Sequence, residues 1–164
     1  MPVLERIRRN HALEHATLAV LASSGVKGLL AGYSTNGGFW LLAPASASTV
    51  EAAANTALER LSSGESHLAI SASCGTNLAV ASLLASAAIR LAKGRSGGGG
   101  AGWLVKTVLV VGALALARPL GIAIQRKLTT LSLVEGMRVS GVSTLRIGQF
   151  HLHRIFTEQR LDPR

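Results

Sequence analysis

Two long apolar stretches in the second half of the chain constrain its fold more than any other feature. Residues 75–92 provide about the 18–20 residues that a helix needs to cross a bilayer, provided that Arg90 reaches back to the interface. A glycine-rich connector at 96–102 follows, and residues 104–124 form the second stretch. We therefore expect residues 75–127 to form a two-helix transmembrane hairpin; the alternative is a helical hairpin buried in a soluble protein.

The second apolar stretch is interrupted by Arg118 and Pro119. An arginine inside a span is costly unless it faces protein or water or lies near the interface. We expect the second helix to cross the bilayer only to about Ala117, and an interfacial segment to begin at Arg118.

The charges of the chain favour a membrane location. It carries 17 Lys and Arg against 8 Asp and Glu, a net charge of +9, although only 15% of its residues are charged. The cations lie beside the apolar stretches, and no recognisable nucleic-acid-binding motif is present. This placement suits lipid headgroups and topology signals, so we expect the lipid bilayer as a partner and no nucleic acid. Two spans put both termini on the same side, and the distribution of Lys and Arg in this chain leads us to expect that side to be the cytoplasm.

The rest of the chain predicts a small α+β unit. Apolar residues spaced three and four apart indicate a helix over 3–22, and two β-prone runs at 28–34 and 39–42 flank the hairpin signal Asn36-Gly37. A helix capped by Ser46 or Ser48 extends to about Leu61, and weak alternation at 67–73 suggests a third strand. Residues 1–74 thus form an expected α-β-β-α-β unit. Strand-like segments at 142–147 and 150–156, within the C-terminal segment 128–164, extend its sheet in this interpretation.

The motif His11-Ala12-Leu13-Glu14-His15 is the candidate for chemistry. Residues four apart project from one face of a helix, so His11 and His15 can bind one divalent metal such as zinc through imidazole nitrogens. A glutamate just before the second histidine can act as general base, as in inverted zinc-peptidase motifs. The alternative is structural: Glu14, on an otherwise apolar face, pairs with a histidine or with an arginine from another segment.

A stable zinc site needs a third protein ligand. The residue types that can supply it are the single cysteine, Cys74, the histidine at His67, and the pair His151 and His153, whose side chains share one strand face. From the residues alone these candidates stay open.

Three segments of the chain resemble a known family. HALEHAT, SASCGTNLA and PLGIAIQRKLTT, in this order, are similar to the three signatures of the YqhQ-like family of bacterial membrane proteins, which are regarded as metal-dependent enzymes of unknown activity. The chain looks like a reduced relative of that family. The resemblance implies that the counterparts of its signature residues are His11, Glu14, His15, Thr17, Cys74, Gly75, Thr76, Gln125, Arg126, Thr129 and Thr130. It favours Cys74 as the third metal ligand, and with it we assign Arg126 the role of clamping the charge of an anionic substrate.

Two functional hypotheses follow from the sequence. The first is a membrane-associated metal-dependent enzyme, such as a hydrolase, in which Glu14 is the general base. The second is a non-enzymatic accessory or assembly subunit, part of a homo-oligomer or of a larger membrane complex, because helices rich in alanine and glycine allow close packing.

Overall fold

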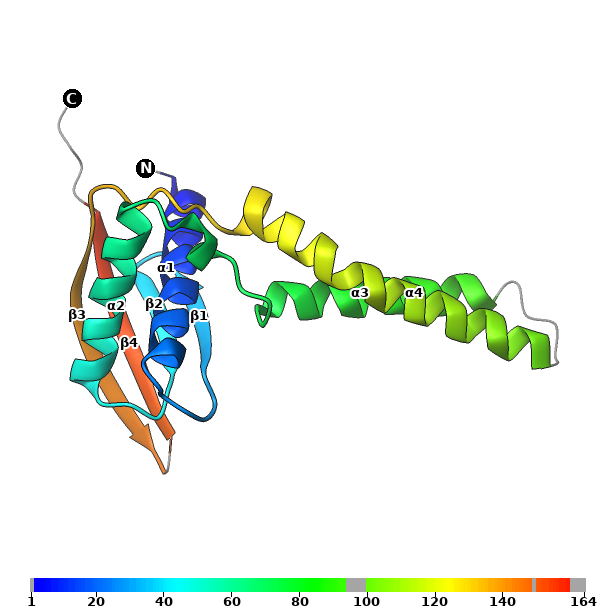
Figure 1. Ribbon diagram of the computed structural model, residues 1–164, viewed down its shortest axis with the longest axis horizontal. Coiled ribbons are helices and arrows are strands. Elements are labelled where there is room, and N and C mark those ends of the chain that lie inside the picture. The colour runs from blue at the N-terminus through cyan, green and yellow to red at the C-terminus, as the bar shows by residue number, and fades with distance from the viewer. Residues whose placement is uncertain (1, 94–99, 149, 160–164) are drawn as a thin grey trace. The chain divides into compact units, whose positions relative to one another are not determined.

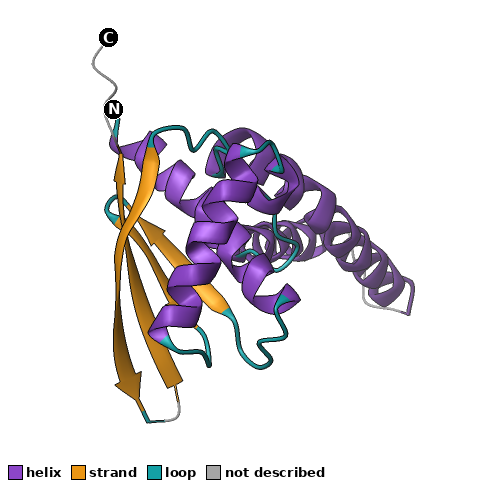
Figure 2. Ribbon diagram, turned by 60° about the vertical axis from the view of Figure 1, so that its left-hand side comes forward, coloured by secondary structure: helices purple, strands orange, loops and turns teal. Residues whose placement is uncertain are grey.

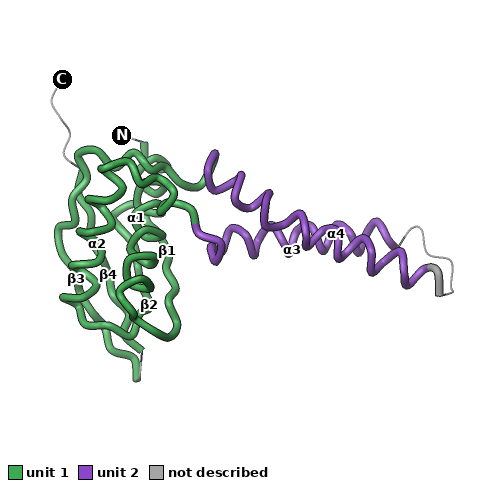
Figure 3. Tube along the Cα trace, in the orientation of Figure 1, with its two compact units in different colours: residues 1–70, 128–164 green, residues 71–127 purple. Residues whose placement is uncertain are grey.

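The computed structural model describes residues 2–93, 100–148 and 150–159 and divides into two compact units. Unit 1 combines residues 1–70 with residues 128–164, and unit 2 comprises residues 71–127 (Figure 3). Unit 1 is the α+β part of the chain, and unit 2 is a helical hairpin. The expected fold class, an α+β unit joined to two long apolar helices, is confirmed.

Unit 1 is a two-layer structure in which helices cover one face of a four-stranded antiparallel sheet (Figures 1 and 2). Its elements are α1 (Val3–Ser23), β1 (Ala31–Thr35), β2 (Gly38–Leu42), α2 (Ala47–Ser62), the 3-10 helix η1 (Ser66–Ala69), β3 (Met137–Ile147) and β4 (Phe150–Gln159). The strand order is β1-β2-β4-β3. The C-terminal strands therefore complete the sheet, and β4 lies at its centre beside β2.

The core of unit 1 lies between the helices and the inner face of the sheet. Successive residues of a strand face opposite sides, so Phe39 and Leu41 of β2 and Ile155 of β4 point inward and are fully buried. They pack against buried residues of both helices, such as Leu13 and Val50. Burying a side chain of this size contributes about 1.5–3 kcal/mol.

Local sequence explains several element boundaries. The side chain of Ser46 caps α2 by accepting a hydrogen bond from the Thr49 N–H at 3.1 Å. The hairpin signal is confirmed, since Thr35 pairs with Gly38 across the turn between β1 and β2. Gly38 has a φ of 127°, and a Cβ there would collide with the backbone of Ile155 on β4, so this position requires glycine.

The strand expected at 67–73 is wrong. The chain forms η1 at Ser66–Ala69 instead, after Gly64 has ended α2 with a φ of 100°. The carbonyl of Ala69 accepts a hydrogen bond from a histidine of α1, so this backbone is bonded to a helix and pairs with no strand among the described residues. Short, weak alternation does not determine whether a strand partner exists.

Unit 2 consists of α3 (Gly75–Lys93) and α4 (Gly100–Ile124), which pack side by side, followed by a π-helical turn, η2, at Gln125–Thr129 whose last two residues belong to unit 1. Both helices are long and apolar enough to cross a membrane. α4 continues through Pro119, so the helix itself extends past Ala117, the position at which we expect the bilayer crossing to end. A proline removes only one backbone hydrogen bond from a helix, and the residues that follow Pro119 are again mostly apolar, so the helix continues. The expected connector at 96–102 lies partly outside the described residues.

A polar network ties α3 to α4 where the chain enters and leaves unit 2. The amide of Gln125, fully buried, accepts from the Ser71 N–H and donates to the Ser71 carbonyl, both at 3.0 Å. It also donates to Oδ1 of Asn77 at 2.9 Å. Gly121 permits this packing, because a Cβ at that position would collide with the Asn77 side chain. Gln125 therefore holds the two helices together through its side-chain amide.

Candidate metal centre

The two histidines of the HALEH motif lie one helical turn apart near the middle of α1. Their ring centroids are 4.3 Å apart and the ring planes are inclined by 60°. His15 is buried and His11 is half-buried. The helix spacing predicted from the sequence thus brings the two imidazoles together.

Both imidazoles bond through Nδ1 to a backbone carbonyl of unit 1. Nδ1 of His15 lies 2.7 Å from the carbonyl oxygen of Ala69, and Nδ1 of His11 lies 3.0 Å from that of Thr129. A carbonyl oxygen only accepts hydrogen bonds, so each Nδ1 carries the proton. In the neutral ring Nε2 then holds the lone pair. Histidines that bind metals usually show this arrangement, since the outer hydrogen bond fixes the tautomer and the ring orientation.

Glu14 points toward the sheet. Its side chain is 4% exposed, and its carboxylate accepts a hydrogen bond from the Ser34 hydroxyl of β1. It lies directly against Gly32, where a Cβ would come within 2.7 Å of the Glu14 Cδ and Cγ atoms. Glycine at position 32 therefore makes room for the buried carboxylate. The sequence reasoning missed Gly32 and Ser34, although a glycine inside a strand is a signal for such close approach.

The segment after η2 runs along the first half of α1. Besides the bond from His11 to Thr129, Nη2 of Arg8 donates to the Thr130 carbonyl at 3.4 Å, and the Leu131 N–H donates to the Arg8 carbonyl at 3.1 Å. Thr130 is buried. The hydroxyl of Thr129 is also buried and has no hydrogen-bond partner in the described part of the chain. Thr17 plays a local role, because its hydroxyl donates to the Leu13 carbonyl within α1 at 2.7 Å.

The other residues that the sequence analysis selected between Cys74 and Arg126 belong to unit 2. Cys74 is buried just before α3, and the Thr76 N–H donates to its Sγ at 3.4 Å. The Cys74 Sγ in turn donates to the Thr76 hydroxyl at 3.4 Å. A Cβ at Gly75 would meet nothing within 4 Å, so packing does not require glycine there. The side chain of Arg126 is exposed.

The other histidines have different surroundings. The side chain of His67 is 73% exposed and lies 4.0 Å from Glu65. His153 is fully buried on β4, between the Ala43 carbonyl at 3.2 Å and the Thr144 hydroxyl at 2.8 Å. Burial lowers the pKa of His153 below its usual value of 6.5, and the Ala43 carbonyl partly offsets this effect. Among the described residues, these histidines join no group of metal-ligating side chains with His11 and His15.

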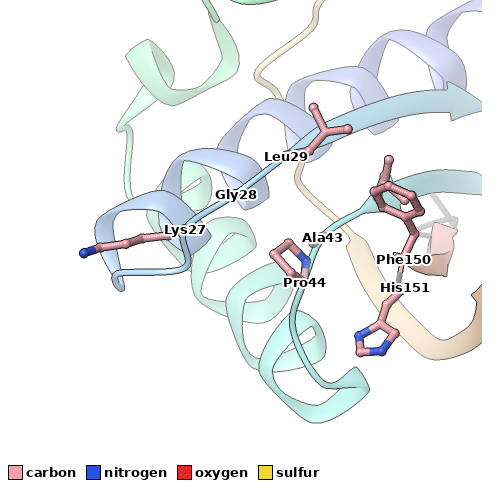
Figure 4. Close-up of a pocket in the computed structure, with 8 residues that line it drawn as sticks. Lys27, Gly28, Leu29, Ala43, Pro44, Phe150 and His151 are labelled. Atoms are coloured by element: carbon pink, nitrogen blue, oxygen red, sulfur yellow. The ribbon is translucent and has the colours of Figure 1, made fainter. Parts of the chain in front are cut away.

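A cavity of about 280 Å³ opens elsewhere in unit 1, lined by apolar residues that include Leu42, Pro44 and Phe150, with His151 at its edge (Figure 4). The Lys27 side chain extends away from these rings. Nδ1 of His151 is bonded to the Ala45 carbonyl at 3.1 Å. The cavity shares no residue with the HALEH motif, so it gives no support to chemistry at that motif.

Fold and site together define an α+β protein with an apolar helical hairpin and, on its first helix, a histidine pair of which His15 is buried and His11 is half-buried. Residues 6–142 match the sequence profile described as "Domain of unknown function (DUF6391)". The chain belongs to that family.

An uncharacterised protein of Picosynechococcus sp. is 37% identical over 108 residues, which cover 60% of this chain and 48% of the relative. The chain thus matches about half the length of this relative. No solved structure matches. These findings establish an uncharacterised family, the broader part of what the sequence resemblance implies; membership of the YqhQ-like proteins is a proposal.

Proposed function

We propose that the chain is a membrane-anchored metalloprotein in which α1 holds a divalent metal, with zinc as the first candidate, and that it is a reduced relative of the YqhQ-like proteins. The observation that carries the metal proposal is the matched pair of Nδ1 bonds from His11 and His15 to backbone carbonyls. These bonds direct both lone pairs to Nε2 on rings only 4.3 Å apart. Two histidines with a purely structural role need not both carry the proton on Nδ1.

The membrane proposal rests on unit 2. Its helices expose apolar side chains such as Leu83, Val108 and Leu114 over much of their surface. Residues 71–127 contain no Asp or Glu, so the excess positive charge of the chain is concentrated there. Two spans return the chain to the side from which it entered. Unit 1 would then lie at one membrane surface, the cytoplasmic one, with both termini on that side.

Cys74 is the proposed third ligand. It follows Ala69, the residue whose carbonyl holds His15, by five positions, and five residues extend over at most about 18 Å. The chain therefore keeps the thiol tethered close to the histidine pair. Two imidazoles and one cysteine sulfur form a donor set that zinc prefers.

Glu14 and Arg126 complete the proposed site. When bound, the metal would act as a Lewis acid toward water and the substrate. We assign the role of general base to Glu14, whose carboxylate the Ser34 hydroxyl holds in place by a hydrogen bond. We assign Arg126, an exposed cation, to the charge of the substrate. The reaction class that these roles support is hydrolysis.

Metal analysis of the full chain purified in detergent tests the proposal. We expect about one equivalent of zinc per chain in the wild type and a loss of most of it in His11→Ala and His15→Ala, whereas His67→Ala, at an exposed histidine, keeps it. Glu14→Gln should retain the metal and lose any hydrolytic activity. Equal metal content in the wild type and in His15→Ala would contradict the proposal.

A second candidate function is an accessory or assembly subunit of a membrane complex, and the outer face of the sheet favours it. The face opposite α1 and α2 carries large apolar side chains that are 36–71% exposed: Tyr33, Trp40, Leu145, Ile147, Phe150 and Phe156. Exposed apolar patches of this kind often mark protein interfaces. Stable partners, or a homo-oligomer, in detergent extracts would support this function, and a solitary monomer would count against it.

A further inference from the structure

We propose that the site takes a phosphate group, held by the Thr129 hydroxyl and the Arg8 guanidinium beside His11. This inference rests on the proposed metal site and names its ligand class. All three residues belong to unit 1.

The Thr129 hydroxyl is the first observation. It is buried, and no hydrogen-bond partner for it exists among the described residues. Buried polar groups nearly always find a partner, because leaving one unsatisfied destabilises the fold. Beside a candidate site, this hydroxyl is the group that we assign to a ligand.

The position of this hydroxyl is the second observation. Thr129 is the residue whose carbonyl fixes the His11 ring, at 3.0 Å. Arg8 lies one helical turn before His11 and donates to the carbonyl of the next residue, Thr130, at 3.4 Å. The hydroxyl, the guanidinium and the imidazole therefore adjoin one short stretch of backbone.

The chemistry of these groups selects the ligand. A hydroxyl and a guanidinium both donate hydrogen bonds, and the guanidinium carries a permanent positive charge, so the ligand is an oxyanion. If His11 holds a metal, the oxyanion contacts three groups: the two hydrogen-bond donors and the metal ion. Inorganic phosphate and phosphate monoesters offer at least three unesterified oxygens and a carboxylate only two, so phosphate fits better. Its source is either a soluble phosphate compound or the headgroup of a lipid.

Calorimetric titration of the zinc-loaded full chain in detergent with inorganic phosphate tests the inference. Thr129→Val, which replaces the hydroxyl by a methyl of similar size, should weaken phosphate binding about tenfold or more, while Thr129→Ser restores it. Arg8→Gln should weaken binding comparably. Thr107→Val, at an exposed threonine of α4, is the matched control and should bind as the wild type does.

Two further readouts separate a ligand-binding role from a structural one. Thr129→Val should keep its zinc and melt no lower than the wild type, because the lost hydroxyl had no partner. A marked fall in its melting temperature would overturn the inference. The inference would also be overturned if Thr129→Val bound phosphate as tightly as the wild type does. The same holds if the zinc-loaded wild type bound neither inorganic phosphate nor a phosphate-bearing lipid.

Lipid nanodiscs identify the source of the phosphate. A lipid headgroup is supported if the wild type binds phosphatidic acid in nanodiscs, if Thr129→Val weakens this binding, and if free phosphate does not displace the lipid. Strong binding of inorganic phosphate alone supports a soluble compound. If the wild type holds no zinc, the metal proposal fails. If phosphate binding still depended on Arg8 and Thr129 in that case, the phosphate site would be supported independently of the metal.

Discussion

Replacing Gly32 by alanine tests whether the space above β1 is reserved for the carboxylate of Glu14. The added Cβ would lie 2.5 Å from Oε1 and 2.7 Å from the Cδ and Cγ atoms of Glu14, so the buried side chain must move away from Ser34. Overpacking costs about 1–3 kcal/mol, and losing a hydrogen bond to a charged group costs about 1.5–3 kcal/mol. Alanine itself is better than glycine inside a strand by about 0.5–1 kcal/mol. We expect a net loss of about 3 kcal/mol.

The sign of the effect should reverse when Glu14 is absent. In a Glu14→Ala background the new methyl has room, so Gly32→Ala should stabilise unit 1 by about 0.5–1 kcal/mol. The matched control is Gly141→Ala on β3, where a Cβ meets nothing within 4 Å and the effect should be the same in both backgrounds.

Denaturant unfolding in detergent measures this double-mutant cycle. In a Trp103→Phe background, Trp40 on β2 is the single tryptophan and reports on unit 1 alone. The coupling energy expected between positions 14 and 32 is the difference between the effects of Gly32→Ala in the two backgrounds, about 3.5–4 kcal/mol. Additive effects, with a coupling near zero, would refute the placement of the carboxylate over Gly32.

Two further predictions concern other buried groups. Burial lowers the pKa of His153. As the pH falls, the unfolded chain therefore binds a proton at this histidine before the folded protein does. The stability due to this group is complete above about pH 6.5 and decreases as the pH falls toward the native pKa. The wild type should therefore lose up to about 1.4 kcal/mol per pH unit more than His153→Gln in denaturant titrations below pH 6.5, and parallel curves would contradict this. Gln125→Leu removes the partners of the Ser71 backbone, so it should destabilise unit 2 by about 2–4 kcal/mol and lower its melting temperature in detergent, whereas the exposed neighbour Arg126→Ala should have little effect.

Local patterns in the sequence were enough to predict most of the elements. α1 forms where the apolar spacing predicts it, α2 forms where apolar spacing and a serine cap agree, and the first hairpin forms at Asn36-Gly37. Apolar length alone marked α3 and α4. The central pairing of β2 with β4 joins strands far apart in the chain, so local patterns left open whether the C-terminal strands would extend the sheet.

The candidate site was predictable only in part. Helical spacing predicts that the imidazoles of His11 and His15 are neighbours, and the structure places them so. Their carbonyl partners could not be predicted, because Ala69 and Thr129 contribute backbone atoms that any residue type offers. Ser34 was missed as a partner of Glu14 for a similar reason, since a serine on a strand carries no pattern of its own.

X-ray absorption at the zinc edge of the metal-loaded full chain tests the central claim most directly. Two imidazole nitrogens at about 2.0–2.1 Å and one sulfur at about 2.3 Å are expected, with one imidazole lost in His15→Ala and the sulfur lost in Cys74→Ser. A spectrum of oxygen ligands alone, unchanged in His15→Ala, would show that α1 does not hold the metal.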